Sequence, residues 1–130
     1  MAVDVTDKPA MTQVIAQVEA SWQQPIDGVF HLAGVTTDNV PMAQMDDALW
    51  QKVMAVKVQG ALILHELFAQ KTLSCFVLFS SIAAVPHFGM AGLSAYAAAN
   101  EFLSGLALYR RGLGLPAISM NWVAWAEKGM

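Results

Sequence analysis

The longest uncharged stretch of the chain places the strongest limit on its fold. From Thr72 to Asn100 there are 29 residues, and none of them is Asp, Glu, Lys or Arg. A span of this length is long enough to cross a bilayer as one helix. Polar and helix-breaking residues interrupt it, however, among them Ser80, Ser81 and Pro86. The stretch is therefore better explained as a buried strand, a polar loop and a helix that packs inside a globular fold.

Short apolar runs alternate with amphipathic segments along the chain. We predict strands over residues 28–34, 76–79 and 117–121, and helices over 9–22, 46–67 and 95–111. Asp4 to Asp7 are expected to end a further strand that leads into the first helix. Thr6 or Asp7 is expected to cap that helix. Strands that are apolar on both faces and alternate with helices are typical of a parallel sheet in an α/β fold. The sheet is thin, so we expect residues 1–130 to form a single, incomplete domain of a doubly wound fold.

Composition excludes several classes of function. The chain has 130 residues, of which 56% are hydrophobic and only 13% are charged, so it can bury a core and disorder is not expected. Seven basic against ten acidic residues give a net charge of −3, which argues against nucleic-acid binding. The single cysteine, Cys75, excludes an internal disulfide. The histidines His31, His65 and His87 lack the spacing of metal ligands, so no metal site is expected, and His31 is expected to pack at a strand end.

Small and polar residues lie at or just after the carboxyl end of each predicted strand. The carboxyl ends of parallel strands lie at one edge of a sheet, where α/β proteins bind their ligands. Many α/β domains carry Ser or Gly at such ends, so this feature alone indicates only where a site would lie. The residues concerned are His31, Ala33 and Gly34, then Ser80 and Ser81, then Asn121 and Trp122.

Tyr96 and Asn100 lie one helical turn apart in a helix whose intervening residues are alanines. The pair could form a proton-handling site beside the serine-bearing strand end, or Tyr96 could be an ordinary core residue. Lys57 lies in an apolar stretch and needs either a partner or a route to solvent, because burying a lone lysine is costly. A tyrosine acid with a supporting lysine suits the protonation of the alkoxide that hydride transfer to a ketone leaves.

Six sequence stretches occur together along the chain. They are DVTD (4–7), GVFHLAGV (28–35), VKVQGA (56–61), FVLFSSIAAV (76–85), YAAANEFL (96–103) and GLPAISMNWVAWAEKGM (114–130). With these stretches, and in this order, the chain resembles the ketoreductase domains of modular polyketide synthases, which belong to the short-chain dehydrogenase/reductase superfamily. The resemblance spans almost the whole chain and implies a Rossmann-type parallel sheet with flanking helices.

The resemblance implies a catalytic role for four residues. Tyr96 would protonate the carbonyl oxygen of the substrate, and Ser81 would donate a hydrogen bond to that oxygen. Lys57 and Asn100 would complete a tetrad. Most of the superfamily has a lysine one helical turn after the tyrosine, whereas this chain has Asn100 there and carries Lys57 on the preceding helix. That exchange is the arrangement of ketoreductase domains.

The resemblance also implies a cofactor and a substrate. The cofactor is expected to be NADPH, and the substrate a β-ketoacyl chain on the phosphopantetheine arm of an acyl carrier protein. Asp38 falls at the fingerprint aspartate of the class that forms the D-hydroxyl, and Phe88 stands where the opposite class has a tryptophan, so both would orient the substrate. The residues expected at the cofactor are Asp4 and Val5 at the adenine, Ala33 and Gly34 at the ribose, and Asn121, Val123 and Ala124 beside the nicotinamide.

The chain departs from the family pattern in three places. No glycine-rich strand-to-helix turn precedes DVTD, although the family uses one to hold the pyrophosphate at a helix N-terminus. The separation of Ser81 and Tyr96 is longer than usual, and Val123-Ala124 replace a Gly-Pro pair. We therefore expect this piece to lack the first strands of the fold, to bind NADPH weakly and to be inactive alone.

A non-catalytic role is the alternative that these departures leave open. The chain would then be a structural or association module that keeps the fold, because its many apolar residues and open sheet edge favour self-association or partner binding. An unrelated α/β binding module is a third possibility. As an enzyme, the chain is expected to have an acyl carrier protein and the rest of a polyketide synthase, or the missing N-terminal half, as partners. No secretory signal follows Met1, so a cytoplasmic location is expected.

Overall fold

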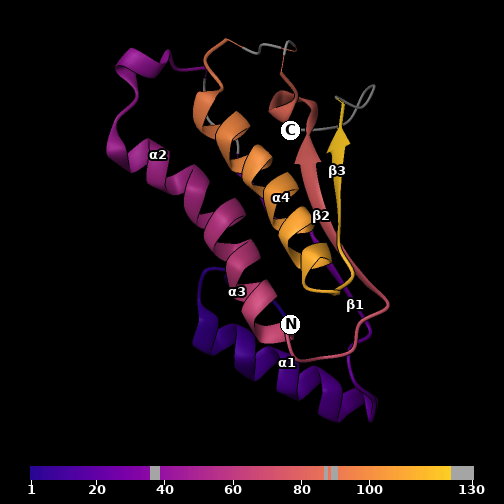
Figure 1. Ribbon diagram of the computed structural model, residues 1–130. Coiled ribbons are helices and arrows are strands. Elements are labelled where there is room, and N and C mark those ends of the chain that lie inside the picture. The colour runs from indigo at the N-terminus through magenta and orange to yellow at the C-terminus, as the bar shows by residue number, and fades with distance from the viewer. Residues whose placement is uncertain (36–38, 87, 89–90, 124–130) are drawn as a thin grey trace.

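The computed structural model describes residues 1–35, 39–86, 88 and 91–123 of the chain (Figure 1). Helices and strands alternate along these ranges. The α-helices are α1 (Lys8–Trp22), α2 (Asp47–Met54), α3 (Gly60–Phe68) and α4 (Ser94–Gly112), and the strands are β1 (Gly28–His31), β2 (Cys75–Ser81) and β3 (Ile118–Trp122). Shorter elements are the 3-10 helices η1 (Met42–Gln44) and η3 (Ile82–Ala84) and the π-helix η2 (Ala55–Gln59).

The three strands form one parallel sheet in the order β1-β2-β3. Val29 of β1 pairs with Phe76, and Leu78 of β2 pairs with Ser119. The predicted α/β fold with a parallel sheet is therefore confirmed, although β1 ends at His31, earlier than predicted. Parallel pairing brings the carboxyl ends of all three strands to the same edge of the sheet, at the top of Figure 1.

Helices α3 and α4 cover one face of the sheet (Figure 1), and the buried core lies between the helices and that face. Side chains alternate between faces along a strand, so Phe30, Val77 and Ile118, which share a register position, lie on the opposite face. Phe30 is 60% and Ile118 50% exposed. Although the strands are apolar on both faces, one face of β1 and β3 stays exposed, because the described helices pack on the other side. The core residues are Ile15, Val29, Ala61, Leu64, Phe68, Leu73, Phe76, Leu78, Leu103, Leu106 and Ala107.

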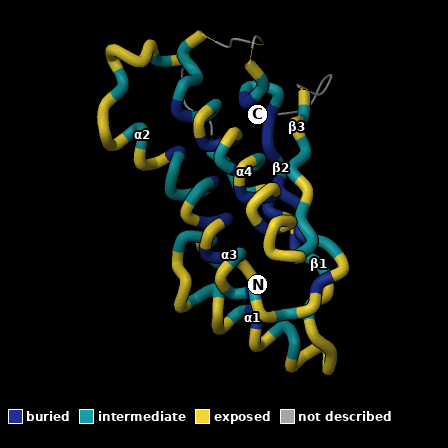
Figure 2. Tube along the Cα trace, viewed as in Figure 1, coloured by how far each residue is buried: buried dark blue, intermediate teal, exposed yellow. Residues whose placement is uncertain are grey.

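The described residues of the uncharged stretch include β2, η3 and the first turns of α4. Phe76 and Leu78 in its strand are almost completely buried. Most of β2 is coloured as buried in Figure 2. The interpretation as a strand, a loop and a packed helix is confirmed. Among the described residues, no helix is both long and apolar enough to span a membrane.

The residues before α1 form a turn. The backbone N–H of Asp7 donates to the carbonyl of Asp4 at 3.1 Å, and the N–H of Thr6 donates to the Asp4 carboxylate at 2.9 Å. The predicted strand end is wrong, because these polar groups are satisfied locally instead of by a neighbouring strand. Asp7 is the cap of α1, since its carboxylate accepts from the N–H of Ala10 at 3.0 Å, and Pro9 lies in the first turn.

The predicted helix over 46–67 is interrupted by a π-turn. Asp46 caps α2 as its side chain accepts from the N–H of Leu49 at 2.7 Å. In η2 the N–H of Gly60 reaches back to the carbonyl of Ala55, which widens the helix by one residue in that turn. Helical periodicity of apolar residues does not reveal such a turn, so the sequence analysis missed it. The turn carries Lys57.

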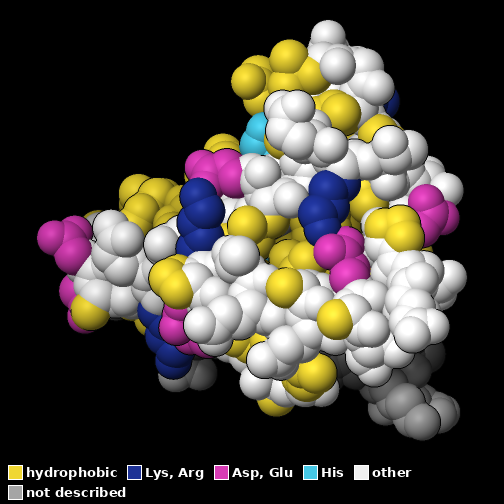
Figure 3. All heavy atoms as spheres, turned by 90° about the horizontal axis from the view of Figure 1, so that it is seen from below, with side chains coloured by type: hydrophobic (Ala, Val, Ile, Leu, Met, Phe, Trp, Pro, Cys, Tyr) yellow, Lys and Arg dark blue, Asp and Glu magenta, His cyan; other side chains and the backbone are white. Residues whose placement is uncertain are grey.

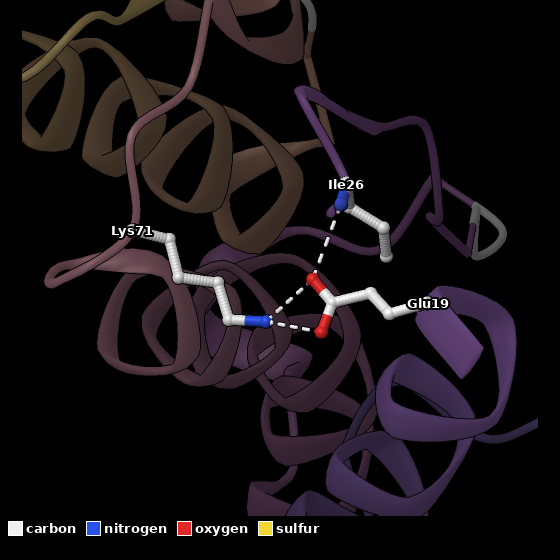
Figure 4. A network of polar contacts seen from close by, with 3 residues as sticks. All are labelled: Glu19, Ile26 and Lys71. Atoms are coloured by element: carbon white, nitrogen blue, oxygen red, sulfur yellow. Dashed lines mark hydrogen bonds and ion pairs between the residues drawn. The ribbon is translucent and has the colours of Figure 1, made fainter. Parts of the chain in front are cut away.

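Polar contacts tie α1 to the rest of the molecule. The Glu19 carboxylate accepts from Lys71 Nζ at 2.6 and 2.7 Å and from the N–H of Ile26 at 3.1 Å (Figure 4). Lys8 Nζ lies 2.6 Å from the Glu66 carboxylate of α3. The underside of the molecule accordingly carries basic and acidic side chains next to one another among apolar atoms (Figure 3). Exposed ion pairs contribute little net stability, so apolar packing is the main force that holds α1.

Arg110, near the end of α4, is fully buried without a carboxylate partner among the described residues. Its guanidinium lies 3.8 Å from the ring centroid of Phe76 and donates to the Pro116 carbonyl at 3.3 Å. A third contact joins Arg110 to the Nδ1 of His65 at 2.9 Å. Because arginine has only donors, His65 Nδ1 must accept, which requires a neutral imidazole. Arg110 thereby links α4 to α3, to β2 and to the loop before β3.

The Arg110–His65 contact predicts loss of stability in acid. Burial, and then the neighbouring Arg110 cation, lower the pKa of His65 below its ordinary value of 6.5. The folded state thus keeps the imidazole neutral while the unfolded chain protonates it, so stability is complete above about pH 6.5 and falls as the pH drops below it. We expect a lower urea midpoint at about pH 5 than at about pH 7.5.

His65→Gln is the control for this pH effect, since glutamine offers Arg110 an acceptor but does not titrate. Its midpoint should fall less between the two pH values than that of the natural chain. The remaining fall includes the contribution of His31, whose pKa burial also lowers. An equal loss in both proteins would contradict the assignment to His65.

Candidate active site

The carboxyl end of β2 places two serines against α4. The hydroxyl of Ser80 is buried and donates to the backbone carbonyl of Asn100 at 3.0 Å. Ser81 is 9% exposed, and its hydroxyl accepts from the N–H of Ala83 at 3.2 Å, which caps η3. Both β2 and η3 pack against α4, the helix that carries Tyr96 and Asn100. The structure therefore places the carboxyl end of β2 next to the helix that carries Tyr96 and Asn100.

Lys57 is buried beside Tyr96. Its side chain is 3% exposed, and Nζ donates to the backbone carbonyl of Phe79 at 2.9 Å. The same Nζ lies 5.6 Å from the ring centroid of Tyr96, a cation–π distance. Burial lowers the pKa of Lys57 to about 8. Of the two alternatives for this lysine, the structure favours a partner over a route to solvent.

Gly34 leaves the space that Lys57 occupies. A Cβ atom at Gly34 would lie 3.1 Å from Cε and 3.4 Å from Nζ of Lys57. Contacts this short would push the end of the Lys57 side chain by a few tenths of an ångström. A side chain at Gly34 would therefore act on the end of the Lys57 side chain.

Tyr96 and Asn100 lie on consecutive turns of α4. The Asn100 side chain is completely buried, and its amide nitrogen donates to the Tyr96 carbonyl at 2.8 Å. Its Oδ1 is buried and has no donor among the described residues. An unsatisfied buried acceptor costs about 1–3 kcal/mol, so this oxygen is a place for a water or a ligand donor. Tyr96 is half-buried and packs against a cluster that contains Val53 and Ala99.

The residues predicted at the cofactor lie at different places. Asp4 is exposed, and its carboxylate accepts from the N–H and the hydroxyl of Thr6, which lowers the pKa of Asp4. Val5 packs on the helix, since a Cβ at Gly60 would lie 2.9 Å from its Cγ1. Ala33 is half-buried after β1, whereas Asn121 and Val123 are exposed at the end of β3.

Two predicted residues, Asp38 and Ala124, lie outside the described residues. Phe88 is 58% exposed, and its N–H donates to the Val85 carbonyl at 3.3 Å. These three positions therefore stay predictions. The contacts that the sequence analysis missed are those of backbone atoms, above all the Phe79 carbonyl that binds Lys57, because a carbonyl has no signature in the sequence.

The described part of the site combines a buried cation, a tyrosine and buried amide and hydroxyl groups. Lys57 holds its ammonium at the ring of Tyr96, while Asn100 ties the Tyr96 backbone to the next turn. A group of three or more His, Cys, Asp or Glu that could hold a metal ion is absent from the described residues. Such an arrangement suits proton transfer by the tyrosine hydroxyl to an oxygen bound nearby.

A family model described as the KR domain matches residues 1–127 of the chain. Among curated proteins, the polyketide synthase GfsE of Streptomyces halstedii is 47% identical over 125 residues, which are 96% of this chain and 3% of that protein. The mycoketide-CoA synthase of Mycobacterium tuberculosis is 43% identical over 127 residues, or 98% of this chain and 3% of that protein. The chain thus spans only a few per cent of the length of these relatives.

Solved structures of similar proteins have the same fold. The ketoreductase from the first module of phoslactomycin biosynthesis in Streptomyces sp. HK803 is 43% identical, with a TM-score of 0.88 over 100% of this chain and 29% of that chain. The structure of an A-type ketoreductase from a modular polyketide synthase is also 43% identical, with a TM-score of 0.92 over 100% of this chain and 26% of that chain. The predicted partial Rossmann-type fold is confirmed by these similarities.

Proposed function

The chain belongs to the ketoreductase (KR) domain family of polyketide synthases, and from this membership we propose that it supplies the catalytic residues of an NADPH-dependent reduction of a β-ketoacyl thioester. The substrate is carried by an acyl carrier protein, and the product is the β-hydroxyacyl thioester. The observation that carries the proposal is the buried Lys57 ammonium, 3% exposed and 5.6 Å from the Tyr96 ring centroid. A structural role alone does not require a cation at this place.

The proposed reaction assigns one role to each residue of the tetrad. NADPH, when bound, supplies the hydride that reduces the ketone carbon. The Tyr96 O–H bond breaks as its proton passes to the substrate oxygen, which becomes the new hydroxyl. Ser81 donates a hydrogen bond to that oxygen and so holds the ketone at Tyr96. Lys57 stabilises the negative charge that forms on Tyr96, and the unpaired Oδ1 of Asn100 is free to bind a water that returns a proton.

The described residues fit a flat cofactor only in part. The backbone after β1, at Ala33 and Gly34, and the end of β3, at Asn121 and Val123, lie at the edge where ligands of parallel sheets bind. The 130 residues contain no glycine-rich turn to hold a pyrophosphate. We therefore propose that the chain alone binds NADPH weakly and is inactive, and that the rest of a ketoreductase domain completes the site.

A non-catalytic association module is the second candidate function. It is supported by the open sheet face, where Phe30 and Ile118 are 60% and 50% exposed in one register row. Apolar exposure of this kind favours contact with another protein surface. Under this alternative the chain contributes no turnover, whatever segment covers the sheet.

A chimera tests the proposal. Residues 1–130 would replace the matching segment of the phoslactomycin first-module ketoreductase, which is 43% identical to this chain. NADPH binding is then measured by fluorescence titration for the chain alone and for the chimera, and β-ketoacyl thioester reduction is measured for both. We expect tight binding and turnover only in the chimera.

The other outcomes of the titration decide between the alternatives. Tight NADPH binding by the 130-residue chain would show that the missing glycine-rich turn is not needed. A folded chimera that neither binds NADPH nor reduces the thioester would favour the association module. The natural phoslactomycin enzyme, assayed in parallel, is the positive control.

A further inference from the structure

His31 contacts the helix turn that carries Lys57. It is the last residue of β1 and is 2% exposed. Its Nε2 lies 3.3 Å from the backbone carbonyl oxygen of Lys57. A carbonyl only accepts, so Nε2 must carry the hydrogen in this contact. Burial lowers the pKa of His31, which keeps the ring neutral, with its hydrogen on Nε2 and none on Nδ1.

The Lys57 carbonyl lies in a π-turn, where the hydrogen bonding of the helix is irregular. In a regular α-helix each carbonyl has its own N–H partner one turn on. In η2 the N–H of Gly60 is shared between the carbonyls of Ala55 and Lys57. The imidazole N–H of His31 gives the Lys57 carbonyl a donor from outside the helix. The histidine thus ties the irregular turn to β1.

A second contact fixes the position of the imidazole against the same turn. A Cβ atom at Gly60 would lie 3.3 Å from Cε1 of His31 and 2.9 Å from Cγ1 of Val5. The helix therefore passes closely over both side chains at Gly60. His31 thus contacts the turn at two points, Lys57 and Gly60. Side chains that pack this closely transmit a displacement instead of absorbing it.

We propose that His31 is a positioning residue for Lys57: its Nε2–H holds the Lys57 carbonyl, and through the π-turn it directs Nζ to the Phe79 carbonyl and the Tyr96 ring. Lys57 itself would touch the reacting groups, and His31 would act only through it. The functional meaning of this role rests on the proposed function. The proposed positioning of Lys57 by His31 does not rest on that function, because it concerns only contacts within the chain.

The titration of Lys57 reports directly on its position. The titratable groups that the described elements bring to Lys57 are Tyr96 from α4 and His31 from β1. Loss of the His31 donor would let the turn relax to a regular helix and bring Nζ nearer to solvent. Since burial is what lowers the Lys57 pKa, a displaced lysine titrates at a higher pH.

The test is an NMR titration of the lysine Cε signals in the 130-residue chain, without NADPH or substrate. Lys57→Arg identifies the signal of Lys57. In His31→Leu, which removes the donor, we expect the Lys57 pKa to rise from about 8 towards the ordinary 10.5. In His31→Gln, whose amide nitrogen reaches a position similar to Nε2, we expect it to stay near the original value. His65→Leu removes an imidazole on α3 that contacts Arg110 instead of Lys57, so it should leave the Lys57 pKa unchanged.

The proposal is overturned if His31→Leu folds and Lys57 still titrates at its original pH. It is also overturned if nitrogen chemical shifts of the natural chain show the hydrogen on Nδ1 of His31, a measurement that needs no variant and therefore applies even if His31→Leu fails to fold. Since neither readout uses turnover, an inactive chimera would refute the proposed function and leave this result intact. In an active chimera, His31→Leu should lower kcat and shift the alkaline limb of the pH–rate profile to higher pH. His31→Gln should restore both kcat and the position of that limb.

Discussion

Tyr96→Phe is expected to abolish almost all ketoreduction by the chimera, with a loss of about 100- to 10,000-fold in kcat. The substitution removes the hydroxyl that gives its proton to the substrate oxygen and leaves the ring in place beside Lys57, which lies 5.6 Å from its centroid. Reduction of the β-ketoacyl thioester under saturating NADPH measures the effect. NADPH binding should change little, since the hydroxyl acts on the substrate.

Tyr109→Phe is the matched control for this prediction. Tyr109 lies on the same helix as Tyr96, but it is 58% exposed and contacts His65 instead of Lys57. The same loss of a hydroxyl should therefore leave kcat unchanged. Comparable losses in the two variants would show that Tyr96 acts through stability, and an active Tyr96→Phe variant would remove it from the proposed mechanism.

Leu103→Ala is expected to lower the free energy of unfolding of the chain by about 2–5 kcal/mol. Leu103 lies on α4 and is completely buried in the core between the helices and the sheet. Removal of its branched end leaves a cavity in the layer that also positions Tyr96 and Asn100. Since small domains are stable by only about 5–15 kcal/mol, the loss should be large enough to measure by urea unfolding.

Leu108→Ala, on the same helix, controls for helix propensity. Leu108 is 62% exposed, so the same truncation should change the free energy of unfolding by less than about 0.5 kcal/mol. A loss at Leu103 no larger than that at Leu108 would contradict the described core. Similar and large losses at both positions would show that Leu108 is covered in solution, as in self-association.

The elements that could be predicted are those with a repeating local signal. The apolar runs around Val29 and Val77 gave strands, and the spacing of apolar residues gave α1 and α4 within a residue or two at each end. Asp7 was one of the two residues expected to cap α1, because a cap needs only a carboxylate at the right distance from the next N–H groups. The strand end predicted at Asp4 is absent from the described residues, because a strand forms only through a neighbouring strand, which a local pattern does not show.

The site was predictable as a set of residues and not as an arrangement. Tyr96 and Asn100 are related by helical geometry alone, so their proximity follows from the sequence. Lys57 is far from both along the chain, and only the packing of the π-turn against β1 and α4 places it at the Tyr96 ring. The Phe79 carbonyl and the His31 tether are equally a product of packing.

The sequence by itself determined the fold class, the order of its elements and the family to which the chain belongs, because these depend on patterns that repeat locally and on motifs read residue by residue. Only the tertiary structure decided that Lys57 is buried, which partner its ammonium has and which face of the sheet stays open. The physical reason is that burial and long-range contacts depend on where distant segments meet. A buried cation shows its chemistry only through the atoms around it, and here those atoms come from β1, β2 and α4.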